Sequence, residues 1–319
     1  MSYYDLTTYP KHDGYVAGQT ALTTNNCYLY FSDGKEYSIR TPSVGSKGYL
    51  IQESRTQKTQ DLQTSCDAGF IPFGNRCIMQ YEAKCSNGGG DTATDGGYPW
   101  SSCTSAGGTV VSASAGEPIT NITQIQAKAA CESIGAHLIT NAEWMAIARD
   151  IEQVASNWTG GAVGSGVLKR GNVGDVAEGN YNGANPEVGV TSDKAKLKLS
   201  NGKEIYHLSG NVYEWVDDTI ETSQIPTPTG WQEYSASIVW NNSYLPRQEA
   251  GPLNVSYNAT THGVGRIYLD PDAASPSGDK HAFLRSLHWG HTSYAGVFAL
   301  NLGYSPSNSD SSVGFRCAR

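Results

Sequence analysis

Charged residues are scarce in this sequence, and basic residues never form a run. Only 16% of the 319 residues are charged, and acidic residues outnumber basic ones by 30 to 22, which gives a formal net charge of -8. Proteins that bind nucleic acid neutralise phosphates with a basic face, so this balance argues against a nucleic-acid partner. We therefore expect a soluble, acidic protein.

Long apolar segments are also missing. No stretch approaches the roughly 18 residues that a membrane helix needs, so we expect no insertion into a membrane. Residues 1–5 (Met-Ser-Tyr-Tyr-Asp) lack the basic-then-apolar order of a signal peptide. Two explanations stay open: export by another route, such as assembly onto a virion, or a leader that is missing from this chain.

Cysteines are present, but never as a CxxC pair, which argues against zinc and leaves no metal-ligand set in view. They stand at Cys27, Cys66, Cys77, Cys85, Cys103, Cys131 and Cys317. Four lie in a Gly/Ser/Thr-rich stretch whose loops disulfides would constrain. We favour disulfides, with buried free thiols of an intracellular protein as the alternative. The odd count leaves at least one thiol unpaired.

Glycine and aromatic residues are plentiful, with 36 Gly, 19 Tyr and 7 Trp, as in a folded protein rich in turns. Residues 1–60 contain short strands between turn signals, at 27–31 and 36–40, and predict a small β-rich N-terminal module. Residues 53–65 are the linker candidate because they are polar and lack periodicity. Residues 61–319 then form the main domain.

Two helices are predicted between residues 123 and 151. Thr123 and Gln126 have the spacing of a capping box, and Gly135 stands where a C-terminal cap belongs. A second helix follows, with Asn141 expected as its N-cap and apolar residues at helical spacing.

Short strands separated by long loops make up the rest. A strand pair is expected at 70–82, two further strands at 194–199 and 205–208, and closing strands at 297–300 and 313–317. This order predicts an α+β fold with a high loop fraction. Loops this long in a compact domain usually carry function.

Three segments resemble C-type lectin domains of the formylglycine-generating-enzyme type. Residues 127–144 are similar to the two-helix segment of that family. Leu-Ser-Gly-Asn-Val-Tyr-Glu-Trp at 208–215 resembles its G-N-V-W-E-W motif, and residues 314–319 resemble its G-F-R-C-A terminus. Because the motifs occur in the family's order, the resemblance spans residues 70–319. It implies a loop-rich C-type lectin fold of the formylglycine-generating-enzyme subtype.

The segment before that terminus is similar to the variable region of target proteins of diversity-generating retroelements. The similarity is carried by Ala-Gly-Val-Phe-Ala-Leu-Asn-Leu at 295–302 and Ser-Pro-Ser-Asn-Ser at 305–309. In that family a reverse-transcription process substitutes residues at adenine-containing codons within a fixed scaffold. The resemblance implies that residues 285–319 are a variable region.

The resemblance also divides this region into scaffold and variable positions. It implies that the scaffold includes Trp289, Phe298, Leu300 and Phe315. It implies that the variable, ligand-binding positions are drawn from Ser286, Leu287, His288, Gly290, His291, Ser293, Tyr294, Gly303, Tyr304, Asp310 and Ser312. These positions alternate with or flank apolar anchors, so we expect them on one outward face, with His288, His291, Tyr294, Tyr304 and Asp310 exposed and close together. Rigid aromatic groups beside small polar residues suit a recognition surface.

An enzyme is the first alternative, because the family's namesake oxidises a cysteine on sulfatases. That chemistry needs a reactive cysteine pair before the last strand, and residues 285–319 contain only Cys317. We therefore expect no catalytic residues and no enzyme. Cys131 and Cys317 resemble the positions of the long disulfide of C-type lectins, so the resemblance implies that they are adjacent.

Calcium-dependent sugar binding is the second alternative. The motifs E-P-N and W-N-D supply calcium ligands in such lectins, whereas this sequence has Glu-Pro-Ile at 117–119 and Trp-Asn-Asn at 240–242. By analogy a structural calcium near Asn211 and Glu214 stays open, but we favour buried hydrogen-bonding roles for both. No other cofactor is expected.

The function implied is binding. A rigid scaffold would display a diversified surface to a protein or other macromolecular ligand on a target cell, from the surface of a virion or a cell. Residues 1–60 would attach, orient or oligomerise it. The alternative is a structural or adhesive surface protein without a diversified ligand, and a formylglycine-generating oxidase is the least favoured function.

Overall fold

The chain divides into two compact units, Met1–Asp61 and Leu62–Arg319. The computed structural model describes residues 27–30, 36–40, 49–51, 65–88, 96–174, 186, 193–270 and 280–319. In the first unit, the described residues form an antiparallel sheet of β1 (Cys27–Tyr30), β2 (Glu36–Arg40) and β3 (Tyr49–Ile51). Most of the expected linker, residues 53–65, lies outside the described residues.

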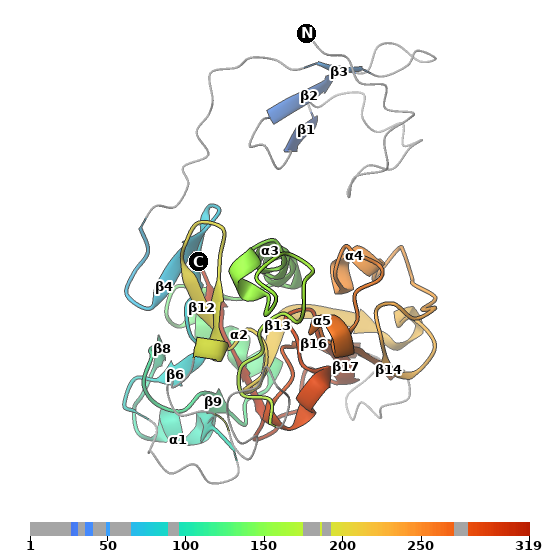
Figure 1. Ribbon diagram of the computed structural model, residues 1–319. Coiled ribbons are helices and arrows are strands. Elements are labelled where there is room, and N and C mark those ends of the chain that lie inside the picture. Colours follow the sequence, from blue (N-terminus) through green and yellow to red (C-terminus); the bar gives the residue numbers. More distant parts are fainter. Residues whose placement is uncertain are drawn as a thin grey trace. The chain divides into compact units, whose positions relative to one another are not determined.

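Helices and sheets are mixed in the second unit, which confirms the α+β class (Figure 1). Its α-helices are α1 (Trp100–Ser105), α2 (Gln124–Glu132), α3 (Asn141–Glu152), α4 (Arg247–Ala250) and α5 (Ala259–His262). Its 3-10 helices are η2 (Ala155–Asn157), η3 (Asp193–Ala195), η4 (Thr222–Gln224) and η5 (Trp289–Tyr294). Within the described segments, no helix has the length and apolar character needed to cross a membrane.

A six-stranded sheet crosses the middle of this unit. In spatial order its strands are β14 (Gly230–Gln232), β15 (Ile267–Leu269), β17 (Leu300–Tyr304), β16 (Lys280–Arg285), β13 (Tyr213–Glu221) and β18 (Val313–Phe315). A four-stranded sheet consists of β10 (His137–Leu138), β19 (Cys317–Ala318), β5 (Arg76–Met79) and β4 (Phe70–Phe73). The remaining strands pair two by two: β6 (Ala83–Cys85) with β8 (Val110–Ser112), β7 (Tyr98–Pro99) with β9 (Ile119–Thr120), and β11 (Lys196–Lys198) with β12 (Glu204–Tyr206).

Helix α2 begins as the sequence predicts. The Thr123 hydroxyl accepts a hydrogen bond from the Gln126 backbone N–H at 3.1 Å, and the Gln126 side chain accepts one from the Thr123 N–H at 3.0 Å. Both bonds of the capping box are therefore present, and two N–H groups at the helix start are satisfied.

Helix α3 begins one residue away from the predicted cap. Thr140, not Asn141, is the N-cap, because its hydroxyl accepts from the Glu143 N–H at 3.2 Å and Glu143 completes a second capping box. The Asn141 side chain is used elsewhere: its carbonyl oxygen accepts from the buried Arg285 guanidinium. The assignment of Asn141 as the cap was wrong because Thr and Asn both favour that position.

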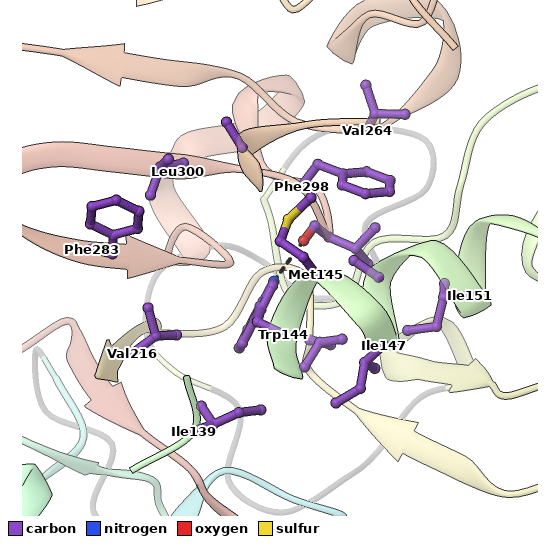
Figure 2. Close-up of a cluster of buried hydrophobic side chains, with 14 of the residues drawn as sticks. Ile139, Trp144, Met145, Ile147, Ile151, Val216, Val264, Phe283, Phe298 and Leu300 are labelled. Atoms are coloured by element: carbon purple, nitrogen blue, oxygen red, sulfur yellow. Dashed lines mark hydrogen bonds between the residues drawn. The ribbon is translucent and has the colours of Figure 1, made fainter. Parts of the chain in front are cut away.

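The apolar face of α3 packs into the main core beneath the sheet (Figure 2). Trp144 is fully buried and its indole N–H donates to the Val297 carbonyl at 2.8 Å. Ile147 and Ile151 follow on the same face, close to Phe298. Burying each such side chain contributes about 1.5–3 kcal/mol, so this face anchors the helix.

The two faces of the large sheet bury different clusters. Along β13, Trp215 belongs to a cluster with Cys131 and Phe315, whereas the next residue, Val216, belongs to the cluster of α3. This alternation is the period of two expected of a strand with both faces covered. The C-terminal strands are therefore held from both sides.

One closing strand begins later in the chain than predicted. Residues 297–300 were expected to be extended, but β17 begins only at Leu300. The Ala299 N–H donates to the Gly296 carbonyl at 2.9 Å, which closes a turn. The residues are buried as the pattern indicated, but a buried apolar run does not distinguish a strand from a tight turn.

Disulfides join six of the seven cysteines: Cys66–Cys77, Cys85–Cys103 and Cys131–Cys317. The last links α2 to β19, with the Cα atoms 5.6 Å apart, inside the range that disulfide geometry requires. Cys27 lies in β1, and its side chain is outside the described residues.

A buried ion pair fixes the end of the chain. Arg316 and Glu214 have no exposed side-chain surface, and the guanidinium donates to both carboxylate oxygens, each at 2.5 Å. It also donates to the carbonyls of Met79 and Tyr206 at 3.3 and 3.0 Å. The last residues are thereby tied to β13, β5 and β12 at once.

Replacing one member of this pair should be more damaging than replacing both. We expect Arg316→Met to lower the unfolding free energy by about 3–5 kcal/mol, since it leaves the Glu214 carboxylate buried without its partner. The double variant Arg316→Met/Glu214→Leu should lose less, because no unpaired charge remains. Urea unfolding measures both; a double variant less stable than the single one would contradict the interpretation.

Candidate ligand-binding surface

One row of side chains crosses the large sheet from its buried half to its half-exposed edge. Trp215 is paired with Leu284, Leu284 with Asn301, Asn301 with Tyr268, and Tyr268 with Trp231. Directly opposed residues in a sheet lie on the same face. Trp215 is fully buried, whereas Tyr268 and Trp231 are half-buried, so the core face of the sheet reaches the protein surface at its β14 edge.

A β-bulge brings a second tyrosine to this face. Tyr304 stands three positions after Asn301 in β17, but their partners in β16, Leu284 and Ala282, are only two positions apart. The extra residue breaks the alternation, so Asn301 and Tyr304 share a side of the sheet. The Tyr304 ring accordingly lies 6.3 Å from the Trp215 ring.

The 3-10 helix η5 and its N-cap residue, His288, add two histidines beside the tyrosine at the start of β13. The His288 and His291 rings are 4.4 Å apart, and they lie 5.2 and 5.3 Å from the Tyr213 ring. His291 also lies 5.3 Å from Trp231. The segment 285–319 and the edge strand β14 therefore meet in one aromatic cluster.

The hydrogen bonds around Tyr213 are all satisfied when His291 is the acceptor. The Gly303 N–H donates to Oδ1 of Asn301 at 2.7 Å, so the Asn301 amide nitrogen is the atom that donates to the Tyr213 oxygen, at 3.1 Å. The Tyr213 hydroxyl proton is then free to donate to Nε2 of His291 at 2.7 Å. His291 accepts at Nε2, which requires the neutral ring with its proton on Nδ1.

His288 is neutral for a related reason. Its Nδ1 accepts the Gly290 N–H at 3.1 Å, which leaves the proton on Nε2. Burial lowers the pKa of His288 to about 4, although the Asp310 carboxylate partly opposes the shift. Burial, reinforced by His288, lowers the pKa of His291 to about 3. Near neutral pH the surface therefore presents two uncharged imidazoles.

Beyond Trp231 the cluster continues to an arginine. The Tyr294 ring lies 5.3 Å from the Trp231 ring, and the Arg266 guanidinium stacks 4.0 Å above Tyr294. Arg266 also donates from Nε to Glu233 at 2.5 Å. We name the six half-buried residues Trp231, Tyr268, His288, His291, Tyr294 and Tyr304 the aromatic–histidine surface.

Most of the variable positions expected from sequence lie on or beside this surface. His288, His291, Ser293, Tyr294, Gly303, Tyr304 and Asp310 are half-buried, and Gly290 is exposed. The expectation that His288, His291, Tyr294, Tyr304 and Asp310 are exposed was wrong, since all five are half-buried and the aromatic rings among them pack against other rings. Gly303 is confined further, since a Cβ there would lie 2.8 Å from the Tyr268 ring.

Three expected variable positions are buried, which corrects their assignment to the surface. Ser286 and Leu287 have no exposed area, because both have positive φ angles (75° and 69°) that turn the chain inward, and the Ser286 hydroxyl donates to the Gly210 carbonyl at 2.9 Å. Ser312 is only 7% exposed because its N–H and hydroxyl donate to Asp310.

The scaffold positions divide in a similar way. Phe298, Leu300 and Phe315 are fully buried. Trp289, which we expected to be buried with the other scaffold residues, is instead half-buried, so that expectation was wrong. The backbone N–H of Trp289 donates to the Asn211 carbonyl at 3.0 Å, which holds this part of the chain at the surface. The Trp289 indole lies 4.9 Å from the His288 ring.

Three residues of this cluster, Trp231, Tyr268 and Tyr213, were not predicted from the sequence. Trp231 and Tyr268 stand in a stretch, 219–280, that shows no periodicity, and only the cross-strand pairing reveals them. Tyr213 had a usable signal, because it replaces a tryptophan of the G-N-V-W-E-W motif. A tyrosine there supplies the hydroxyl that His291 accepts.

Asn211 and Glu214, considered for calcium, have buried hydrogen-bonding partners. The Asn211 amide donates to Glu82 at 2.6 Å, and both Glu214 oxygens accept from Arg316. In the part of the chain that the structure describes, no group of three or more His, Cys, Asp or Glu side chains is arranged to hold a metal ion.

Comparison with known proteins gives one family match. Residues 43–319 match the model of the sulfatase-modifying factor enzyme 1-like domain. No curated protein matches the chain. Among solved structures, variable protein 1 of Treponema denticola is similar, with 14% identity over 93% of this chain and 99% of that one, and a TM-score of 0.32.

The two histidines should make stability depend on pH. A histidine whose folded pKa lies below the ordinary 6.5 binds its proton more tightly in the unfolded chain. The unfolding free energy should therefore fall as pH drops from 6.5 towards about 4 and about 3, and this contribution should level off below those values. Protonated His291 also loses its bond from Tyr213.

The matched control is the double variant His288→Gln/His291→Gln, which keeps polar acceptors and cannot titrate. Across this window we expect wild type to lose several kcal/mol more than the variant, since each unit by which a histidine pKa is lowered corresponds to about 1.4 kcal/mol. Urea unfolding at several pH values measures the difference. Imidazole NMR resonances of His288 and His291 that titrate near 6.5 would refute the assignment.

Proposed function

The chain belongs to the family of sulfatase-modifying factor enzyme 1-like domains, and on this basis we propose that it is a binding protein with a diversified ligand surface. The fold is the predicted C-type lectin fold of the formylglycine-generating-enzyme subtype, with its α+β, loop-rich architecture. In the proposal, the aromatic–histidine surface contacts the ligand, and the buried sheet beneath it is the constant scaffold.

This proposal rests on the observation that residues expected to be variable lie close together in the structure. His288, His291 and Tyr304 surround Tyr213, and Tyr294 joins them through Trp231. These residues come from η5 and β17, and the region between them packs into the core. A set of positions inferred from sequence resemblance alone thus supplies four of the six members of one continuous surface.

The core beneath the aromatic–histidine surface is packed in a way that suits substitution of the surface residues. Phe298, Leu300 and Phe315 are fully buried between the sheet and its flanking elements, and Cys131–Cys317 fixes the terminal strand. A preorganised scaffold loses little conformational entropy on binding, and its own stability depends weakly on exposed side chains. Tyrosine, tryptophan and histidine provide rigid contact area.

The cysteines support a function other than oxidation. Formylglycine-generating chemistry needs a reactive pair near the last strand, and Cys317, the only cysteine of residues 285–319, is bonded to Cys131 on α2. We therefore propose that the protein is not an enzyme and requires no cofactor.

Display from a virion or cell surface, towards a macromolecule on a target cell, completes the proposal. Three disulfides suit an oxidising environment outside the cytosol. The net charge of -8 disfavours nucleic acid as the ligand. A structural or adhesive protein with a constant surface is the competing function, and it predicts no diversification.

Deep sequencing of the gene in its source population tests diversification. We expect amino-acid differences at adenine-containing codons of the surface positions His288, His291, Ser293, Tyr294 and Tyr304. The codons of the buried residues Ser286, Leu287 and Ser312 should stay constant. A control stretch that encodes residues 105–139, as long as the stretch for 285–319, should stay constant too. An adenine-rich near-copy of the codons for 285–319 should lie close to the gene, beside a reverse transcriptase gene. Differences spread evenly over both stretches would overturn the proposal.

Substitution at the surface should leave the fold intact. We expect Ser293→Ala and Tyr304→Ala to change the unfolding free energy by about 1 kcal/mol or less, because neither side chain is fully buried. Phe298→Ala and Phe315→Ala should each cost about 3–5 kcal/mol through the cavities they leave. Urea unfolding measures all four; equal losses in the two pairs would show that surface and scaffold are not separable.

A further inference from the structure

Two imidazole nitrogens on the aromatic–histidine surface are not used by the protein itself. Nδ1 of His288 accepts the Gly290 N–H, which leaves Nε2 of that ring. Nε2 of His291 accepts the Tyr213 hydroxyl, which leaves Nδ1. Within the described residues, neither remaining nitrogen has a hydrogen-bond partner, and neither is one of the polar atoms that are buried without a partner. Both nitrogens are therefore open to solvent and to a ligand.

Both open nitrogens are hydrogen-bond donors. The Gly290 backbone N–H can only donate, so Nδ1 of His288 carries no proton and the proton of the neutral ring is on Nε2. The Tyr213 oxygen already accepts from the Asn301 amide, which leaves Nε2 of His291 as the acceptor for the Tyr213 proton. The proton of the neutral His291 ring is then on Nδ1. Since the two ring centroids are only 4.4 Å apart, the surface offers two neighbouring N–H groups.

The absence of a side chain at position 290 keeps the His288 donor uncovered. A Cβ atom on Gly290 would lie 2.9 Å from Cε1 of His288 and 3.9 Å from Nε2. The first distance is shorter than carbon–carbon packing allows, since the optimum is about 3.5–4.0 Å. The φ angle of Gly290 is not positive, so the constraint comes from the ring and not from the backbone conformation. Any larger residue at this position would therefore displace the imidazole or cover its edge.

The surroundings of the two donors favour an acceptor without charge. The Asp310 carboxylate opposes the lowering of the His288 pKa, so its negative charge reaches this ring. A carboxylate bound at Nε2 of His288 would be repelled by Asp310, whereas a carbonyl oxygen carries no net charge. A carbonyl oxygen also accepts up to two hydrogen bonds and has no proton of its own to place. A sugar hydroxyl, in contrast, needs an acceptor for its proton as well as a donor.

We propose that His288 and His291 form a donor pair for an amide carbonyl oxygen of a protein ligand, and that Gly290 keeps this pair accessible. The inference rests on the proposed function only in taking the aromatic–histidine surface as the binding face. It adds the chemical class of the group that is bound. It also makes position 290 a determinant of specificity, because a side chain there would remove one of the two donors from the ligand.

Titration of the full-length wild-type protein with N-methylacetamide at neutral pH tests the donor pair. The matched control is N-methylthioacetamide, which has the same shape but carries a weakly accepting sulfur in place of the oxygen. NMR spectra that correlate ring C–H protons with ring nitrogens report each nitrogen, and the loss of signals in His288→Gln and His291→Gln assigns them. We expect saturable shifts of Nε2 of His288 and Nδ1 of His291. The thioamide should bind more weakly by a factor of about 2–10, as the loss of one neutral hydrogen bond implies.

One variant and one internal control locate the effect. Gly290→Ala should weaken N-methylacetamide binding by a factor of about 2–10, because the added methyl group lies against the His288 ring. Thermal unfolding shows whether this variant is folded. His281 is the internal control, since its ring nitrogens already contact the Thr222 hydroxyl at 3.0 Å and the Leu302 carbonyl at 2.7 Å. The His281 signals should not move during the titration.

Equal binding of amide and thioamide, or no shift at either histidine, would overturn the donor pair. So would tighter binding of acetate than of N-methylacetamide, which indicates an anion site, or shifts with methyl glucoside alone, which indicate a sugar. The same spectra show which nitrogen of each ring is protonated, and a proton on Nδ1 of His288 or Nε2 of His291 would also refute the proposal. None of these results bears on diversification, which the codon pattern tests, so the two proposals can fail independently.

Discussion

Arg316 donates to both oxygens of Glu214 at a point where neither side chain reaches solvent. Burying this pair is costly unless every charge and polar atom is matched, and the carbonyls of Met79 and Tyr206 complete the match. The same residues bring strands from the beginning, middle and end of the second unit together. With Cys317 next in sequence and bonded to Cys131, the terminal strand cannot shift without breaking several interactions at once.

The geometry of the candidate surface follows from that fixed frame. Since β18 pairs with β13 and β13 with β16, the register set at Glu214 passes across the sheet to Asn301 and on to Trp231. A bulge in β17 then turns Tyr304 to the same side. The sheet itself supplies part of the surface, because Tyr268 and Trp231 end the row that is fully buried at Trp215, and η5 with its N-cap residue supplies the histidines and Tyr294.

The sequence was sufficient to predict structure where neighbouring residues determine it or where a recognisable motif is present. The capping box at Thr123 and the α+β order were predicted correctly. It failed where the chain reverses: Ser286 and Leu287 have positive φ and turn inward, and no spacing rule foresees this. It also failed for Trp289, which the family resemblance grouped with the buried scaffold and which is half-buried. Trp231 and Tyr268 were missed because strand pairing between distant segments, not sequence, places them beside η5.

The positions of the surface differ in how freely they can change. Ser293 and Tyr304 make no side-chain hydrogen bond within the described residues, so their replacement leaves nothing unpaired. His291 is different, because its Nε2 accepts a hydrogen bond from the hydroxyl of Tyr213, a residue that is only 3% exposed. A substitute without an acceptor leaves that hydroxyl unsatisfied, at a cost of about 1–3 kcal/mol, against a typical total stability of about 5–15 kcal/mol. A scaffold tied by disulfides and a buried ion pair can sustain one such loss. Substitution at position 291 should therefore lower the stability of the protein, whereas substitution at positions 293 and 304 should not.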